Sequence, residues 1–355
     1  MRLLRPAWAV CLALVYPFLA PAARAADGAG LGLFASHTDV GSPKQAGTVT
    51  YDAAAGTYTI GGAGLNMWFK TDSFHYVWEK IEGDIALAAD IAFVGTGGNA
   101  HRKGVLMIRQ ALDQDSAYAD VALHGDGLTS LQFRETAGDV THEVQTAVKA
   151  PKRLRLEKIG DYVYMSLAGV DGVLQPSGCS TRLPFKGPFY IGLGVCAHDD
   201  NAFETAVFSN VVLGPPSAGA TAVRSSVEYV KVPSGDRVCV FPGSGRINSV
   251  EWTKDDGWRF MQDSTVFSIP AIDGSRKPVP ATAVPPPPNG PSPDGKWTAA
   301  FAHQGGDAVL TLRATADGEV RELMRIHDQA DAPVAIAWSP DSTKIAYVRY
   351  QPARK

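Results

Sequence analysis

The strongest constraint on the fold is the alternation of apolar and polar side chains in residues 101–134. Such alternation is typical of strands that bury one face, because successive side chains of a strand point to opposite sides. Residues 118–124 and 128–134 divide in this way, with Val121, Leu123, Leu131 and Phe133 on one face and Tyr118, Asp120, His124, Ser130, Gln132 and Arg134 on the other. Residues 105–108 are apolar on both faces, which indicates a central strand that ends at Arg109. The stretch therefore predicts three consecutive strands with one face on a core and the other toward water or a ligand.

The polar face of these strands holds the first candidates for ligand binding: Arg109, Asp120, His124, Gln132 and Arg134. A sugar ring has an apolar face and a rim of hydroxyl groups, so sugar sites combine aromatic side chains with polar groups. Residues 66–78 supply the aromatic candidates Trp68 and Trp78, and His101 and Arg102 precede the central strand. Three alternatives to ligand binding remain open: that the tryptophans belong to the core, that Arg109 forms a cross-strand ion pair with Asp120, and that residues 101–103 only cap a strand.

The N-terminal residues predict export. Arg2 and Arg5 precede an apolar run over residues 7–20, and residues 23–25 form a small-x-small cleavage site, which is the pattern of a signal peptide over residues 1–25. Its removal deletes three arginines and no acid, which takes the formal net charge from −3 to −6. There is no basic block with interleaved aromatic residues, so a nucleic-acid partner is not expected. We expect a periplasmic or secreted protein that does not span the membrane after cleavage.

The 355-residue chain divides into two regions of different character. Residues 26–213 contain many short apolar runs separated by Gly, Asp and Asn, which favours a β-sandwich of jelly-roll type. Residues 214–221 are small, uncharged and proline-containing, as in a linker. Residues 222–355 then carry a repeat, in which residues 252–258, 291–297 and 338–344 align at spacings of 39 and 47 residues. Glycines 235, 274 and 318 recur at the similar spacings of 39 and 44 residues, and each unit has about the length of one propeller blade.

These segments carry two resemblances. The sequences SPDGKWTAAF (residues 292–301) and WSPDSTKIAYV (residues 338–348) resemble the repeats of TolB-type β-propellers of bacterial periplasmic proteins. Residues 66–84, 101–109, 118–135 and 192–211 resemble the laminin-G/concanavalin-like sandwich that precedes such repeats in some exported bacterial proteins. Together they imply an all-β chain, a concanavalin-like β-sandwich (jelly roll) followed by a partial TolB-type β-propeller.

The propeller resemblance is incomplete, because the chain has room for about three blades where such propellers usually have about six. An open arc leaves unpaired strand edges. Three explanations are open: the arc docks on the sandwich, it pairs with a second chain, or the gene is truncated. Residues 278–293, with four consecutive prolines at 285–288, predict a stiff extended loop where strand sequence would be expected.

Catalytic chemistry has little support in the sequence. Glu79, Glu82 and Asp84 form the one local acid cluster that resembles a glycosidase pair, but their spacing fits a turn better than alternation along one strand. Nucleophile elbows, zinc-protease motifs and phosphate loops do not occur. We therefore expect no catalytic residues, no metal and no other cofactor. Residues 198–201 resemble a calcium-type oxygen cluster, but a solvated loop explains them as well.

Three cysteines remain after cleavage, so at least one thiol stays free: Cys179, Cys196 and Cys239. Cys179 and Cys196 both lie late in the first region and are a candidate disulfide.

The sequence leaves three hypotheses for function. The first is a non-catalytic exported protein whose sandwich binds a glycan or envelope polymer and whose propeller repeats dock a protein partner. The second is a protein–protein scaffold of a TolB-like envelope or transport system that binds no sugar. The third and weaker one is a glycoside-hydrolase-like enzyme that uses the acid cluster at residues 79–84.

Overall fold

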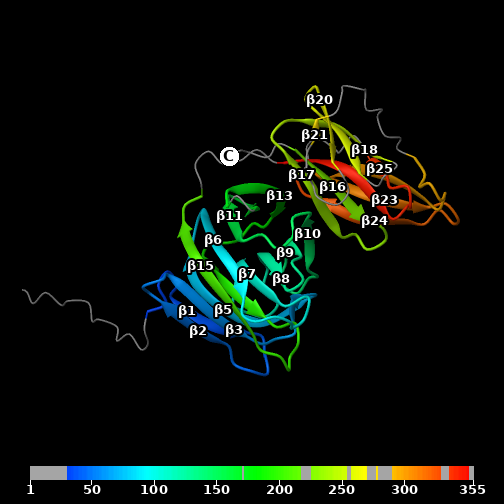
Figure 1. Cartoon of the computed structure of the whole chain (residues 1–355). Coiled ribbons are helices and arrows are strands. Elements are labelled where there is room, and N and C mark those ends of the chain that lie inside the picture. The colour runs from blue at the N-terminus through cyan, green and yellow to red at the C-terminus, as the bar shows by residue number, and fades with distance from the viewer. Residues whose placement is uncertain are drawn as a thin grey trace, which may run out of the picture. The chain divides into compact units, whose positions relative to one another are not determined.

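The computed structural model describes residues 30–169, 172–216, 225–253, 257–269, 277–278, 290–328 and 336–351. All regular elements in these ranges are β-strands (Figure 1). The strands of the first region are β1 (Ser36–Val40), β2 (Thr48–Asp52), β3 (Thr57–Gly62), β4 (Asn66–Trp68), β5 (Thr71–Ile81), β6 (Ile85–Phe93), β7 (Lys103–Arg109), β8 (Tyr118–His124), β9 (Thr129–Arg134), β10 (His142–Thr146), β11 (Arg153–Ile159), β12 (Tyr162–Ala168), β13 (Leu174–Arg182), β14 (Phe189–Cys196) and β15 (Glu204–Gly214).

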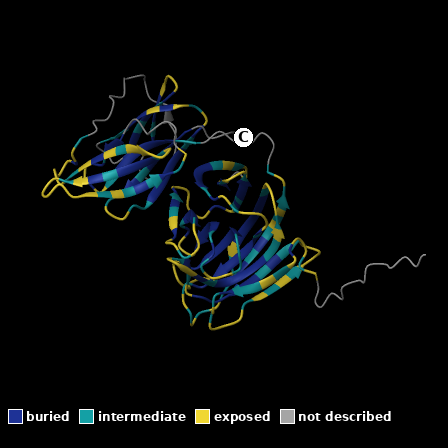
Figure 2. Cartoon of the chain, turned by 180° about the vertical axis from the view of Figure 1, so that it is seen from behind, coloured by how far each residue is buried: buried dark blue, intermediate teal, exposed yellow. Residues whose placement is uncertain are grey.

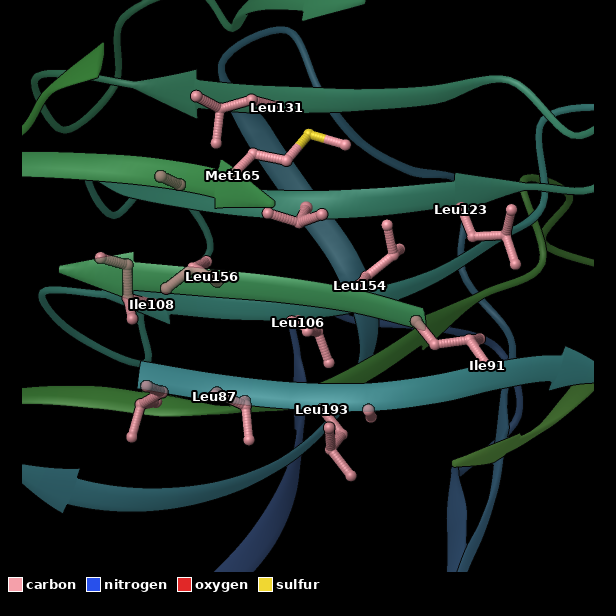
Figure 3. Packing of buried hydrophobic residues seen from close by; sticks show 14 of the residues in the cluster. Leu87, Ile91, Leu106, Ile108, Leu123, Leu131, Leu154, Leu156, Met165 and Leu193 are labelled. Atoms are coloured by element: carbon pink, nitrogen blue, oxygen red, sulfur yellow. The ribbon is translucent and has the colours of Figure 1, made fainter. Parts of the chain in front are cut away.

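These strands form a sandwich of two sheets. In the first sheet the order is β1-β5-β14-β7-β8-β9-β10, with β4 paired to β5; in the second it is β13-β12-β11-β6-β15-β3-β2. All pairs within the sandwich are antiparallel. A continuous apolar core lies between the sheets, as Figure 3 shows for ten labelled side chains that include Leu87, Leu106, Leu131 and Leu154. Figure 2 shows the strands mostly dark blue and the connecting loops mostly yellow.

The face assignment of the central stretch is confirmed. Val121 and Leu131 belong to the inter-sheet core, whereas Tyr118 and Ala122 lie in a second apolar cluster on the opposite face of the first sheet. The expected central strand β7 lies between β14 and β8, and every residue of it is buried. Strands β2 and β3 form an antiparallel hairpin.

Glycines in β14 allow the first sheet to pack tightly. A Cβ on Gly192 would lie 1.9 Å from the carbonyl oxygen of Val77 on the neighbouring strand β5. A Cβ on Gly194 would lie 3.1 Å from the ring of Phe74, which occupies the space that a side chain would need. The alternation of glycine with apolar residues in this strand therefore marks close packing.

The second region contains β16 (Ser225–Lys231), β17 (Arg237–Gly243), β18 (Ile247–Trp252), β19 (Trp258–Gln262), β20 (Thr265–Ile269), β21 (Lys277–Pro278), β22 (Trp297–Gln304), β23 (Asp307–Ala314), β24 (Val320–Ile326), β25 (Ile336–Trp338) and β26 (Lys344–Tyr350). They form three small groups: β17-β16-β26-β25, β18-β19-β20-β21 and β22-β23-β24. Strand β17 also pairs in parallel with β10, which extends the first sheet of the sandwich to twelve strands. An edge of the second region is thus covered by the sandwich, which is the docking alternative raised by the sequence.

Two of the aligned repeat turns have the same hydrogen bonds. The Ser292 hydroxyl donates to Asp294 at 2.6 Å and accepts from the amide of Trp297 at 3.0 Å. In the other turn, the Ser339 hydroxyl donates to Asp341 at 2.6 Å and accepts from the amide of Lys344 at 2.9 Å. The exit positions, Gly295 and Ser342, have φ of 73° and 61°, so both turns end in the left-handed conformation. The third turn falls partly on residues 254–256, outside the described residues.

The prediction of an all-β chain with a large two-sheet sandwich is confirmed, while the partial propeller stays a prediction. The signal peptide (residues 1–25) and most of the linker (217–221) and of the proline-rich loop (279–289) lie outside the described residues. Within the described ranges, no helix has the length and apolarity needed to span a membrane. Cys179 and Cys196 do not face each other: Cys179 lies in the inter-sheet core with Cys239, and Cys196 lies in the cluster on the opposite face.

Candidate functional site

The predicted polar face of β7, β8 and β9 exists, but it is covered. Arg109, Asp120 and Arg134 have no exposed surface, Gln132 is 1% exposed and His124 is 4% exposed. The cover is the hairpin formed by β4 and β5. The Met67 carbonyl accepts hydrogen bonds from Lys103 and from the Tyr118 hydroxyl, at 3.2 and 3.0 Å. The expectation that this face is turned toward water or ligand is therefore wrong, because a segment about 50 residues earlier in the chain lies over it.

One carboxylate organises the centre of this buried face. Asp72, at the start of β5, accepts from Arg134 at 2.8 and 3.0 Å and from Arg109 at 3.3 Å. The two guanidinium groups also donate to backbone carbonyls, including those of Phe69 and Asp113. Arg109 therefore does not form the cross-strand pair with Asp120 that the sequence left open, because in the register of β7 and β8 Asp120 lies opposite Met107.

A second polar group lies at the other end of the same face. The Lys103 ammonium donates to the side chains of Asn66 and Gln132, at 2.8 and 3.0 Å, in addition to the Met67 carbonyl. Burial lowers the pKa of Lys103 and raises that of Asp120 well above its usual range, while attraction between the two opposes both shifts. Neither oxygen of Asp120 has a hydrogen-bond partner among the described residues. Each of these two charges is therefore disfavoured by its surroundings.

Histidines gather beside Lys103. The ring of His101 is exposed and lies 5.7 Å from that of His124 and 5.4 Å from that of His198, centroid to centroid. Burial lowers the pKa of His124 to about 2, and the charge of Lys103 adds to this effect. No group of three or more metal-ligating side chains in the described ranges is arranged to hold a metal ion.

Two further predicted residues have structural partners. Arg102 is buried and forms an ion pair with Glu204 at 2.6 Å, beside the ring of Phe93. Trp78 is half-buried and packs edge-to-face on Tyr190, with ring centroids 5.0 Å apart. Both contacts fit the alternatives in which these residues serve the fold.

The remaining candidate, Trp68, lies at a groove of about 670 Å³. Its walls come from both regions of the chain: Trp68, Phe133, Glu135, Thr141, His142, Glu143, Ser234, Gly235, Asp236, Arg237, Glu322, Leu323, Met324, Arg325 and His327. The groove adjoins the buried polar face, because the Lys103 ammonium lies 5.5 Å from the centroid of the Trp68 ring. Thr141 at its wall also contacts Arg134, at 3.3 Å.

Charged side chains of both signs line this groove and most are paired. His327 lies between Glu135 and Asp307, with its two ring nitrogens 3.0 Å from their carboxylates. The contact with Glu135 raises the pKa of His327, and burial opposes the shift. Arg325 pairs with Glu322 at 2.7 Å. These pairs fix the positions of polar groups along the groove.

Sequence reasoning found one of the fifteen lining residues, Trp68. The sequence of residues 142–148 predicts only a strand, although Glu143 is visible there as an acid in a polar-apolar alternation. The wall formed by residues 234–237 and 322–327 has no signal in the sequence, because its proximity to β9 and β10 depends on the pairing of β10 with β17. The acid cluster is divided between the end of β5 and the following turn, where the Asp84 carboxylate accepts from the amide of Gly160 at 2.8 Å.

No family model matches the chain, and no curated protein matches it. Among solved structures, it is similar to a functionally unknown protein from Saccharomyces cerevisiae, with 14% identity, 52% of this chain and 98% of that chain covered, and a TM-score of 0.41. It is also similar to the carbohydrate-binding module CBM66 from Bacillus subtilis, with 21% identity, coverages of 51% and 96%, and a TM-score of 0.33.

A third similar structure is alginate lyase A1-II′ of polysaccharide lyase family 7, with 11% identity, coverages of 48% and 84%, and a TM-score of 0.33. These structures include both a binding module and an enzyme. At TM-scores below 0.5, none of them assigns a function or a site to this chain.

Proposed function

We propose that this is an exported, non-catalytic glycan-binding protein that holds a sugar chain in the groove beside Trp68. The observation that carries the proposal is the half-buried indole at the wall of a groove of about 670 Å³, surrounded by fixed polar groups. Ligand sites commonly have volumes of about 300–1,000 Å³ and combine aromatic surface with a few placed polar groups. The apolar face of a pyranose stacks on an indole while its hydroxyl groups bond to the polar wall.

The proposed binding site lies at the border of the polar face of β7, β8 and β9, not on the face itself. The polar face supports the site from behind, since Lys103 contacts the Trp68 ring and Arg134 donates to the Trp68 carbonyl. Export rests on the signal-peptide pattern of residues 1–25, and the absence of catalysis on the poor fit of the acid cluster at residues 79–84. If the acid cluster is mutated and glycan hydrolysis is not lost, the hydrolase hypothesis is wrong.

The decisive experiment compares Trp68→Ala with Phe69→Ala on a glycan array and by titration calorimetry. Phe69 is the adjacent residue, is 69% exposed and does not line the groove, so it is a matched control for loss of an aromatic ring. We expect Trp68→Ala to weaken binding of the best glycan by at least about tenfold, or about 1.4 kcal/mol, and Phe69→Ala to leave it unchanged. Equal affinities for the two variants would move the site away from the groove.

The scaffold hypothesis has one observation in its favour, the outer strand β22 of the three-stranded sheet. Its burial pattern is mostly exposed or half-exposed, and among the described residues its only ladder is with β23, while its other side carries a single bridge from Thr298 to Pro291. An exposed edge strand is a site where another chain adds a strand. Consistent with the TolB resemblance, the three small sheets would then be blades that present such an edge to a protein partner. A blank glycan array together with a mass in solution above that of the monomer would favour this hypothesis.

A further inference from the structure

The cationic side chains of the groove are already bound to carboxylates. Arg237 is buried and donates to Glu228 at 2.7 Å and to the Tyr347 hydroxyl at 3.0 Å. Arg325 donates to Glu322 at 2.7 Å, and its second ion pair is with Asp307 at 3.4 Å. His327 lies between Glu135 and Asp307, as described above. To bind an anion, these cationic side chains would therefore have to break their present ion pairs.

Two carboxylates of the groove have no cation in contact within the described part of the chain. Glu143, half-exposed on β10, accepts from the side-chain amides of Gln132, at 3.4 Å, and Gln145. Asp236 accepts from the Ser234 hydroxyl at 2.9 Å. The Lys103 ammonium attracts Glu143 through space, but it is buried behind Gln132 and its three donors are directed to Asn66, Met67 and Gln132. The groove thus offers negative charge to a ligand.

We propose that the groove selects glycans that carry free amino groups, such as chains of glucosamine, over neutral chains and over chains of uronic acids. This inference rests on the proposed glycan-binding function and names its substrate class. A protonated amine would donate charge-assisted hydrogen bonds to Glu143, and such bonds are stronger than those between neutral groups. A uronic carboxylate would instead approach two unpaired acids without a free cation to offset the repulsion.

Trp68 and Glu143 have separate roles in this arrangement. The indole gives affinity to any pyranose with an apolar face, because stacking does not depend on the ring substituents. Glu143 distinguishes an amine from an acetamide or a carboxylate, which makes it the specificity-determining residue. The two are linked through Lys103, which contacts the Trp68 ring and donates to Gln132, which in turn donates to Glu143.

The test measures binding of three hexasaccharides by calorimetry: glucosamine, N-acetylglucosamine and a uronic acid, at a pH at which the amine is protonated. We expect the full-length protein to bind the glucosamine hexamer at least about tenfold more tightly than the acetylated one, with an affinity that falls as salt is added. Glu143→Gln should reduce the glucosamine affinity to about that of the acetylated hexamer. The control Glu82→Gln, an exposed acid outside the groove, should leave all affinities unchanged.

The results separate the amino-sugar preference from glycan binding itself. Tighter binding of the uronic chain, or equal binding of the two glucosamine forms, would overturn the amino-sugar assignment and leave glycan binding in place. Binding of none of these hexamers or of any glycan on the array would overturn both. If Glu143→Gln lowers the midpoint of thermal unfolding, Asp236→Asn provides a second variant, for which we expect a smaller loss of the same glucosamine preference.

Discussion

Asp72 binds the guanidinium groups of Arg109 and Arg134 at the same time, and neither its side chain nor theirs is exposed. Three buried charged side chains are costly to desolvate, so the net contribution of the intact group to stability is small. Removal of the one acid is different, because it leaves two buried cations without a counter-charge. The three charged side chains therefore hold the β4–β5 hairpin over the polar face, because separating them would leave buried charges unpaired.

Replacement of Asp72 by Asn is expected to lower the free energy of unfolding by about 3–5 kcal/mol, the usual cost of removing one partner from a buried ion pair. Equilibrium urea unfolding measures this change. Asp113→Asn is the control, since its side chain is exposed on the loop that follows β7 and only its backbone carbonyl binds Arg109. A loss below about 1 kcal/mol for Asp72→Asn would show that the two cations find other partners.

His124 makes stability depend on pH in a predictable direction. Burial lowers its pKa from 6.5 to about 2, so the unfolded chain binds a proton below pH 6.5 that the folded protein does not. Stability from this residue is therefore full above pH 6.5 and is lost as the pH falls, by up to about 1.4 kcal/mol per pH unit. Between pH 6.5 and 5, the wild type should lose about 1.6 kcal/mol more than His124→Gln in urea unfolding. An equal loss would mean that folded His124 is protonated in this range.

At the residue scale, the sequence predicted which side chains share a face but not whether that face is open. The alternation around Asp120 and Gln132 placed both correctly on the side away from the core. Their burial depends on the backbone carbonyls of Met67, Trp68 and Phe69, and a carbonyl group leaves no trace in a side-chain pattern.

Among the elements, β14 shows how a strand without side chains on one face determines its neighbours. The alternation of Gly192 and Gly194 with apolar residues is visible in the sequence, and it indicates close packing or a bend. The structure identifies the partner, since Gly192 lies against the backbone of β5 at Val77. The short hairpin strand β4 could not be predicted in this way, because three residues are too few to show an alternation of apolar and polar side chains.

Gly192→Ala should be strongly destabilising, because the added methyl group would lie 1.9 Å from a backbone oxygen in the middle of the first sheet. We expect a loss of about 1–3 kcal/mol or more in the free energy of unfolding, as for overpacked cores. Gly214→Ala is the matched control: apart from the two neighbouring residues in the chain, no atom of the described residues lies within 4 Å of the position that its added methyl group would take, and its effect should stay within about 0.5 kcal/mol. Similar stabilities of the two variants would show that β5 and β14 separate readily.

At the scale of the whole molecule, the sandwich and the second region share a sheet and a buried pair of thiols. Cys239 on β17 and Cys179 on β13 belong to the same apolar core, and the contact between the thiols raises the pKa of Cys239, to which burial adds. The groove of the candidate site depends on the same association. The second wall of the groove therefore could not be predicted from the sequence. The repeat turns at residues 292 and 339 could be predicted, because they are local.

Refolding in the presence of glutathione disulfide should join Cys179 to Cys239, with two protein thiols oxidised and one glutathione disulfide reduced. Peptide mapping by mass spectrometry should find this cross-link in the wild type and in Cys196→Ser, and should not find it in Cys179→Ser. A peptide that links Cys179 to Cys196 would contradict the placement of these residues in separate clusters.

The pairing of β16 with β26 has a consequence for protein engineering. Ser225 lies opposite Tyr350 in this pair, so the described part of the second region begins and ends on neighbouring strands. A segment whose ends lie this close can be inserted into a surface loop of an unrelated host without forcing the host's chain apart. Residues 225–351 could therefore be transplanted as a cassette, which would break the pairing of β10 with β17 and remove Cys239 from the sandwich core.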